Sequence, residues 1–211
     1  MPIYLLSPLA SEGTIHLPMI KFTLCKVKID LSICDVLMFT SKQAVKSAEA
    51  LNPAWKTIPC IAIGESTANV IKSLGGTVVQ QTKTFYAKSV AEDIIEMFKG
   101  KKVLYLRPKE VSFDSKSFLA KSGIVLQEQV IYETSCLDYG IEYKPSKNAI
   151  IIFSSPSTIQ CFLKNFSWDK SYIAIVIGEA SKKHLPKNAK YKVADTPSVE
   201  ACIAKAKEFY I

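Results

Sequence analysis

The fold is decided by the stretch Ile150-Ile151-Ile152-Phe153-Ser154-Ser155-Pro156-Ser157-Thr158, in which an apolar run ends on two hydroxyls and resumes after a proline. The four apolar residues predict a buried strand. The residues that follow predict a helix start, because Ser155 can cap a helix and Pro156 suits its first position. The exposed N–H groups of such a helix start favour anionic ligands. The stretch therefore predicts a strand, an anion-binding turn and a helix.

The same pattern occurs earlier in the chain, in Val36-Leu37-Met38-Phe39-Thr40-Ser41. A glycine loop follows each copy at the same distance: Gly64 lies 23 residues after Ser41 (64 − 41), and Gly178 lies 23 residues after Ser155 (178 − 155). Repeated elements in the same order indicate two related units. A chain of 211 residues is long enough for two units of about 100 residues, each with its own core.

Apolar runs and amphipathic stretches with capping signals alternate along both halves, which is typical of doubly wound parallel sheets. Strands are expected at 3–6, 36–39, 60–63, 77–79, 103–106, 124–130, 149–153, 173–177 and 190–193. A further strand, with one solvent-exposed face, is expected at 22–29. Helices are expected at 42–51, 67–74, 90–98, 115–121, after Pro156, after Ser181 and at 198–209. The fold class is therefore α/β.

The second half contains only three strands of its own, so the strand at 3–6 is expected to complete its sheet. This makes the C-terminal domain discontinuous, with residues 1–24 and 136–211 around an inserted domain at 31–130. Residues 25–30 and 131–135 are then the linker strands. In open parallel sheets ligands bind outside the carboxyl ends of the strands. A site is therefore expected in a cleft between the two sheets.

The formal net charge of +8 favours an anionic partner. Nucleic acid is disfavoured, because the lysines are scattered and Arg107 is the single arginine, whereas nucleic-acid modules use clustered arginines and aromatics. No run approaches the roughly 20 apolar residues of a membrane span. The six cysteines form no Cys-x-x-Cys motif and no Cys/His cluster, so they are interpreted as reduced core residues of a cytoplasmic protein.

The usual catalytic and cofactor motifs are missing from the sequence. His16 and His184 are the two histidines, and neither has metal-ligand spacing. No glycine-rich nucleotide loop occurs, so no cofactor and no metal are expected. Hydroxyl and backbone N–H donors at the strand ends remain as the candidate binding groups. Each of these hydroxyls is also a candidate helix cap, and both roles can coexist.

Several short motifs in order resemble the uroporphyrinogen-III synthase family. They are Phe39-Thr40-Ser41, Ile63-Gly64-Glu65-Ser66-Thr67-Ala68, Tyr132-Glu133-Thr134, Phe153-Ser154-Ser155-Pro156-Ser157 and Ile177-Gly178-Glu179-Ala180-Ser181. The resemblance runs from Val36 to the C-terminus. It implies two flavodoxin-like α/β domains joined by two strands, with the first domain split by the chain.

The resemblance also implies a cofactor-free reaction. The linear tetrapyrrole hydroxymethylbilane would be cyclised, with inversion of its ring D, to uroporphyrinogen III and water. Its eight carboxylates would account for the basic charge. Hydroxymethylbilane synthase would be the partner that hands over this substrate, and a monomer is expected.

The resemblance assigns roles to particular residues of this chain. Tyr132 matches the tyrosine proposed to assist departure of the substrate hydroxyl. Its phenol has an unperturbed pKa near 10, so hydrogen-bond assistance is expected; an interdomain packing role is the alternative. The expected substrate-binding residues are Thr40, Ser41, Gly64, Ser66, Thr67, Arg107, Ser155, Ser157, Gly178 and Ser181.

Two departures and one competing function accompany the resemblance. Leu6-Ser7-Pro8 stands where many family members have Thr-Arg-Pro, so an expected basic contact is absent. Ala180-Ser181-Lys182 stands where threonines and an alanine are common, which weakens the assignment of Ser181. The competing function is that of a non-catalytic two-domain protein that binds an anionic small molecule.

Overall fold

The computed structural model describes residues 1–81, 100–111 and 126–210, and its contacts divide the chain into two compact units. The split unit contains Met1–Lys21 and Ser135–Ile211, and the inserted unit contains Phe22–Thr134. The chain therefore passes from the split unit into the inserted unit once and returns once.

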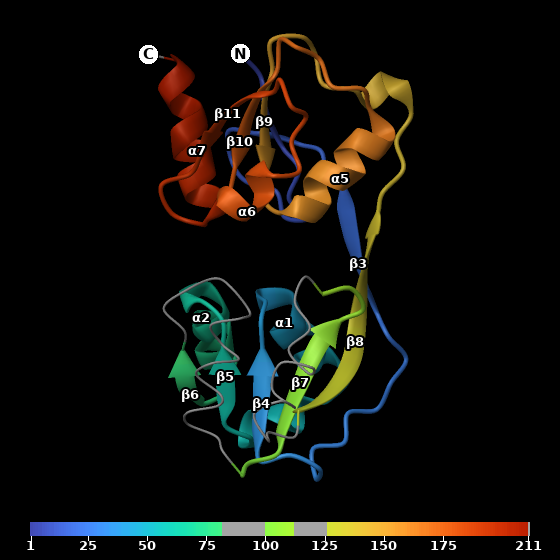
Figure 1. Ribbon diagram of the computed structural model, residues 1–211, viewed down its shortest axis with the longest axis vertical. Coiled ribbons are helices and arrows are strands. Elements are labelled where there is room, and N and C mark those ends of the chain that lie inside the picture. Colours follow the sequence, from blue (N-terminus) through green and yellow to red (C-terminus); the bar gives the residue numbers. More distant parts are fainter. Residues whose placement is uncertain (82–99, 112–125, 211) are drawn as a thin grey trace. The chain divides into compact units, whose positions relative to one another are not determined.

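The split unit is built on parallel strands (Figure 1). In sheet order, those in the described residues are β2 (Ile15–His16), β1 (Ile3–Leu5), β9 (Ile150–Phe153), β10 (Ile173–Val176) and β11 (Lys190–Val193). Tyr4 of β1 pairs with Ile151 of β9, which confirms that the N-terminal strand joins this sheet. Numbered along the chain, the order is 2-1-3-4-5, as in flavodoxin.

Helices cover both faces of this sheet. They are α5 (Pro156–Asn165), α6 (Glu179–Lys182) and α7 (Val199–Lys207), with short 3-10 turns η2 (Ile141–Tyr143) and η3 (Glu208–Tyr210). Ile152 packs with Ile203 of α7, whereas Phe153 meets Phe162 of α5 at 5.6 Å between ring centroids. Because successive strand residues point to opposite faces, α5 and α7 lie on opposite sides of the sheet. Burial on both faces explains why β9 is apolar throughout.

The inserted unit also has a parallel sheet, with one antiparallel edge strand. In sheet order, the strands of the described residues are β6 (Val78–Gln81), β5 (Cys60–Ala62), β4 (Val36–Phe39), β7 (Val103–Pro108), β8 (Leu126–Cys136) and β3 (Ile20–Leu24). Helices α1 (Lys42–Leu51) and α2 (Glu65–Ser73) and the 3-10 turn η1 (Pro53–Thr57) complete its described part. Phe39 and Leu106 form one core with Val45 of α1 and Trp55.

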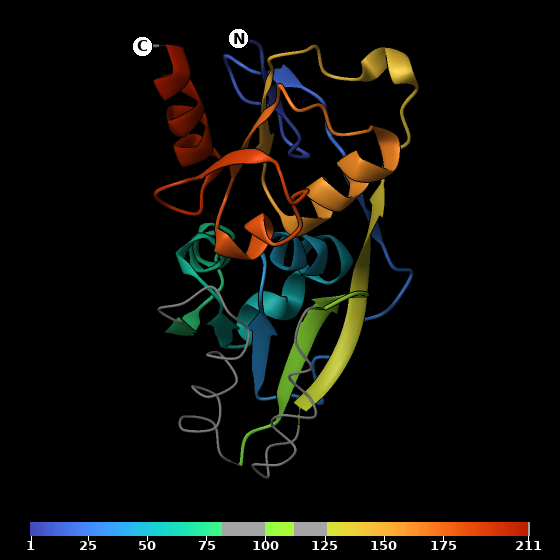
Figure 2. The same ribbon diagram turned by 45° about the horizontal axis from the view of Figure 1, so that its top comes forward.

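Strands β3 and β8 carry the chain between the units and pair with each other. They run in opposite directions, since Cys25 donates its N–H to Ile131 at 3.0 Å and Leu137 donates to Met19 at 2.9 Å. Figure 2 shows β8 lying along β7 and extending past it. The expected strand at 22–29 is wrong beyond Leu24, because the N–H of Val27 bonds back to Cys25 and turns the chain.

Other differences from the expected elements are small. Most strand ends shift by one to three residues, and β8 continues to Cys136 because it pairs with β3 as well as β7. Helix α6 begins at Glu179, before Ser181 and not after it, and α2 begins at Glu65, because each starts directly after a loop glycine. The helices expected at 90–98 and 115–121 lie outside the described residues.

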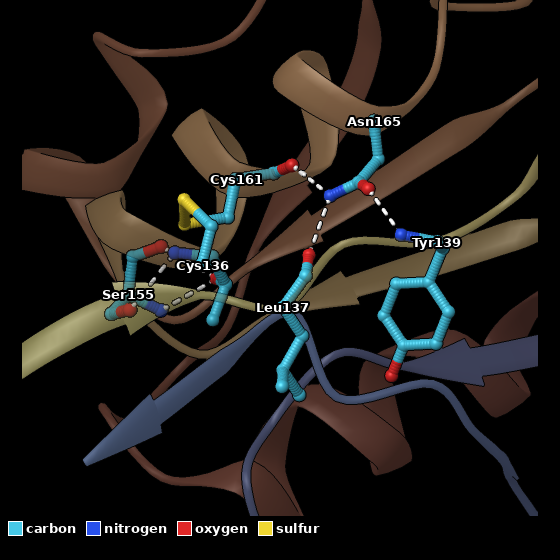
Figure 3. Close-up of a disulfide and its surroundings, with 7 residues drawn as sticks. Cys136, Leu137, Tyr139, Ser155, Cys161 and Asn165 are labelled. Carbon is cyan, nitrogen blue, oxygen red and sulfur yellow. Dashed lines mark hydrogen bonds between the residues drawn. A yellow bond between two sulfur atoms is a disulfide. The ribbon is translucent and has the colours of Figure 1, made fainter. Parts of the chain in front are cut away.

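The interpretation of all six cysteines as reduced is wrong. Cys136, the last residue of β8, forms a disulfide with Cys161 of α5 (Figure 3). Asn165 at the end of α5 adds hydrogen bonds to the same segment, donating to the carbonyl of Leu137 at 2.9 Å and accepting from the N–H of Tyr139 at 2.7 Å. The spacing of 25 residues has no motif, so only the packing of α5 against the end of β8 brings the thiols together.

The disulfide leads to a stability prediction. Replacing both cysteines, as Cys136→Ser with Cys161→Ser, should lower the free energy of unfolding by about 3 kcal/mol, because the open chain gains the entropy that the closed loop lacks. Urea unfolding of the double variant and the wild type measures this. Cys25→Ser, at a half-buried free thiol, is the control. Thiol titration of the unfolded, unreduced wild type should detect four thiols, and six would contradict the disulfide.

Candidate functional site

The strand order of the inserted unit places one loop at a topological switch point. From β4 the chain adds β5 and β6 on one side, and then β7 and β8 on the other. The loops after β4 and β7 therefore leave the sheet in opposite directions, and such a point opens a crevice for ligands at the carboxyl ends of the strands. Thr40 and Ser41 occupy the loop after β4.

The split unit has its own switch point between β1 and β9. Ser154 and Ser155 follow β9, and Ser7 follows β1. Ser7 is buried, and its hydroxyl accepts the N–H of Leu9 at 3.3 Å. Ser7, which stands where the resemblance leads us to expect a basic residue, therefore stabilises its own turn.

Ser41 and Ser155 both cap helices. Ser41 Oγ accepts the N–H of Ala44 at the start of α1 at 3.1 Å. Ser155 Oγ accepts the N–H of Thr158 at 3.3 Å, and Thr158 Oγ1 accepts the N–H of Ser155 in return, which completes a capping box. Each cap is worth about 1 kcal/mol. Ser157 is half-buried in the first turn of α5.

Tyr132 reaches the same switch-point loop from β8. Its Oη lies 3.0 Å from Ser41 Oγ, and its ring packs edge-on against Phe22 with centroids 5.7 Å apart. The residue is 4% exposed, and burial raises the pKa of its phenol. The phenol therefore stays protonated at neutral pH and acts as a hydrogen-bonding group.

Tyr105 was not among the expected site residues, yet it forms a hydrogen bond with Thr40, the other hydroxyl-bearing residue of this loop. Its Oη lies 2.8 Å from Thr40 Oγ1. Burial raises the pKa of Tyr105 to about 12. A signal was present in the sequence, because a tyrosine in the otherwise aliphatic run Val103–Leu106 needs a partner for its hydroxyl once buried.

The glycine loops differ in their backbone. Gly64, before α2, has φ +72°, a left-handed conformation that favours glycine. Gly178, before α6, has φ 179°, which is ordinary extended backbone. Ser66 is exposed, whereas Thr67 and Ser181 are 3% and 2% exposed. Of these three glycine-loop hydroxyls, which were expected to bind substrate, that of Ser66 is therefore the one accessible to solvent.

Arg107 is engaged within its own turn. Its Nη1 donates to the carbonyls of Pro108 at 2.9 Å and Lys109 at 3.0 Å, and its Nε lies 3.5 Å from a carboxylate oxygen of Glu128. The Nε contact is an ion pair without hydrogen-bond alignment. These contacts stabilise the turn after β7, and contact with a substrate carboxylate stays a prediction.

The structure thus brings the candidate residues into two groups. In the inserted unit, Thr40, Ser41 and Tyr132 share the switch point, with Tyr105 added. In the split unit, the loops after β9 and β10 are neighbours because those strands pair. Within the described ranges no cluster of histidines, cysteines and carboxylates could hold a metal ion, and no helix there is long and apolar enough to cross a membrane.

Tyr105 gives a prediction for alkaline stability. Its pKa is about 12 in the folded protein and 10 without burial, so above pH 10 the unfolded chain releases a phenolic proton that the folded protein keeps. This contribution to stability is complete below pH 10 and falls as the pH rises toward 12. Urea unfolding from pH 8 to pH 11.5 measures the decline, which should be shallower for Tyr105→Phe. Equal slopes would contradict the buried phenol.

Comparison with known proteins identifies the family. A model described as uroporphyrinogen-III synthase HemD matches residues 10–204. The crystal structure of uroporphyrinogen-III synthetase from Helicobacter pylori 26695 is similar, with a TM-score of 0.80, 26% identity and 99% of each chain covered. A mutant uroporphyrinogen III synthase from the extreme thermophile Thermus thermophilus shares the fold, with a TM-score of 0.59, 9% identity and coverage of 98% of this chain and 97% of that one. Curated proteins yielded no match. With the family model spanning nearly all of both units, the chain belongs to the uroporphyrinogen-III synthase family.

Proposed function

We propose that this protein cyclises hydroxymethylbilane, with inversion of ring D, to uroporphyrinogen III and water. The observation that carries the proposal is the bond between Tyr132 and Ser41 at a switch point, in a chain that belongs to this family. A phenol there can assist a leaving hydroxyl without any cofactor. The protein is then a lyase that eliminates water.

The proposed reaction needs positioning more than strong acid or base. Loss of the substrate's terminal hydroxyl as water leaves an azafulvene. Attack by the substituted carbon of ring D forms a spiro intermediate, and cleavage followed by reclosure at the other carbon inverts the ring. The protein has to hold the conformation that selects this attack, and preoriented N–H and hydroxyl donors serve that purpose.

The contacts of Tyr132 suit a hydrogen-bond donor to the leaving hydroxyl. Ser41 Oγ accepts the N–H of Ala44, and its own proton can go to Tyr132 Oη, since either hydroxyl of that pair can donate. The phenol proton is then left to point at the substrate, in a chain of hydrogen bonds that polarise one another. Burial keeps the phenol protonated, so it assists as a donor and does not ionise.

The carboxylates are the groups by which the substrate would be recognised. The net charge of +8 attracts a polyanion, and each unit offers its own donors at strand ends. Thr40, Ser41 and Ser66 are those in the inserted unit, and Ser155 and Ser157 begin α5 in the split unit. Gly64, Thr67, Gly178 and Ser181 would act through their loop backbone, and Arg107 through its guanidinium.

The proposal also covers the oligomeric state, the source of the substrate and the cellular location. The protein would act as a monomer and receive its substrate from hydroxymethylbilane synthase. A cytoplasmic location also belongs to the proposal. The Cys136–Cys161 disulfide removes one sequence argument for that location, while four other cysteines are free thiols.

Product analysis tests the function directly. The pure protein, incubated with enzymatically generated hydroxymethylbilane, should yield uroporphyrinogen III, which chromatography of the oxidised porphyrins separates from isomer I. Isomer I forms spontaneously, so a reaction that yields isomer I alone would refute catalysis. Binding of the polyanion without isomer III would favour the non-catalytic binding protein.

Tyr132→Phe should lower kcat about tenfold, because one hydrogen bond to the departing hydroxyl is lost in the transition state. The melting temperature should change little, since the ring stays in its core. Tyr139→Phe is the control, because that phenol bonds to the carbonyl of Pro18 in the split unit and should leave kcat unchanged. Unchanged turnover in Tyr132→Phe would remove the assigned role.

A further inference from the structure

We propose that Tyr105 is a positioning residue that aims the Thr40 hydroxyl at a carboxylate of the substrate. The inference rests on the proposed function, because the carboxylate belongs to the proposed substrate. Tyr105 lies in the middle of β7, outside every motif of the family resemblance. It acts through Thr40 and does not itself touch the substrate.

The sheet register brings the two residues together. Met38 of β4 pairs with Tyr105 of β7, so their side chains share one face of the sheet. Thr40 comes two residues after Met38 and continues on that face, where its Oγ1 meets Tyr105 Oη at 2.8 Å. Tyr105 is 3% exposed, whereas Thr40 is half-buried. The tyrosine is therefore fixed in the core and the threonine is partly open to solvent.

Either hydroxyl of this pair can donate, and in the proposed arrangement Tyr105 is the donor. Each hydroxyl has one proton to donate and an oxygen that accepts, so Tyr105 can donate to Thr40 while Thr40 donates elsewhere. Burial raises the pKa of Tyr105 to about 12, so the phenol carries its proton at neutral pH. With Tyr105 donating to Thr40, the proton of Thr40 remains for an acceptor outside the loop.

Thr40 and Ser41 make different contacts and have different proposed roles. Ser41 caps α1 and pairs with Tyr132, whereas Thr40 has no capping role. Successive residues point to opposite faces, so Tyr132 holds Ser41 on the face of the α1 core and Tyr105 holds Thr40 on the other. Tyr132 serves the leaving hydroxyl, and the Thr40–Tyr105 pair serves binding of a carboxylate.

This division predicts separate kinetic effects. Tyr105→Phe should raise KM three- to tenfold and leave kcat within twofold, because the Thr40 hydroxyl loses its orientation and the chemical step is untouched. Thr40→Val should raise KM by a similar factor. The double variant should be no worse than Thr40→Val alone, since Tyr105 acts only through Thr40. Kinetics with hydroxymethylbilane measure all three.

Tyr172→Phe is the matched control. Tyr172 is also a buried phenol with a pKa raised to about 12, and it donates to the carbonyl of Pro145 in the split unit. Its KM should equal that of the wild type. A rise in KM for both tyrosine variants would reveal a general folding effect and overturn the inference. Additive effects of Tyr105→Phe and Thr40→Val would overturn it as well.

Direct binding separates this inference from the proposed function. Uroporphyrin III carries the same eight carboxylates, and its affinity can be measured by fluorescence without turnover. Tyr105→Phe should weaken it three- to tenfold, and equal affinity would refute the positioning role. Failure of the wild type to make isomer III would instead refute the function and leave the binding result to decide on Tyr105. If Tyr105→Phe does not fold, Thr40→Val decides, and an unchanged KM and affinity would refute the inference.

Discussion

The described site of the inserted unit depends on the Ser41 hydroxyl. Ser41 follows β4, accepts the N–H of Ala44 in the first turn of α1, and has its Oγ 3.0 Å from Tyr132 Oη on β8. One oxygen therefore ties a central strand, a helix start and a linking strand together. The orientation of Tyr132 is set by the same contact that stabilises the fold, so the phenol that we propose as the donor is in place before any ligand binds, as electrostatic catalysis requires.

The strand orders explain why these loops, and not others, carry the candidate residues. The two sheets are wound differently, 2-1-3-4-5 in the split unit and 3-2-1-4-5 in the parallel part of the inserted unit, yet each reverses direction once. At the reversal, neighbouring loops diverge and leave strand ends uncovered. Thr40 and Ser41 lie at one reversal and Ser154 and Ser155 at the other.

The two switch-point loops are stabilised by different means. The loop after β4 is held by phenols from β7 and β8. The loop after β9 has a capping box, and the helix that it begins is fastened to the end of β8 by the Cys136–Cys161 disulfide and by Asn165. Figure 3 shows these contacts along α5. Because β8 is also one of the connecting strands, the point where the chain returns to the split unit is covalently fixed to α5.

The sequence by itself determined the local elements and the family. Apolar runs such as Ile150–Phe153 and caps such as Ser41 and Ser155 specify strands and helix starts through interactions within a few residues, and short motifs in order indicated the family that the comparisons established. Tertiary structure alone decided the disulfide, the ion pair of Arg107 with Glu128 and the pairing of Tyr105 with Thr40. Tyr105 and Thr40 are 65 residues apart, and no local pattern encodes that distance. Strand order and register set it, because they determine which side chains from distant segments share one face of a sheet.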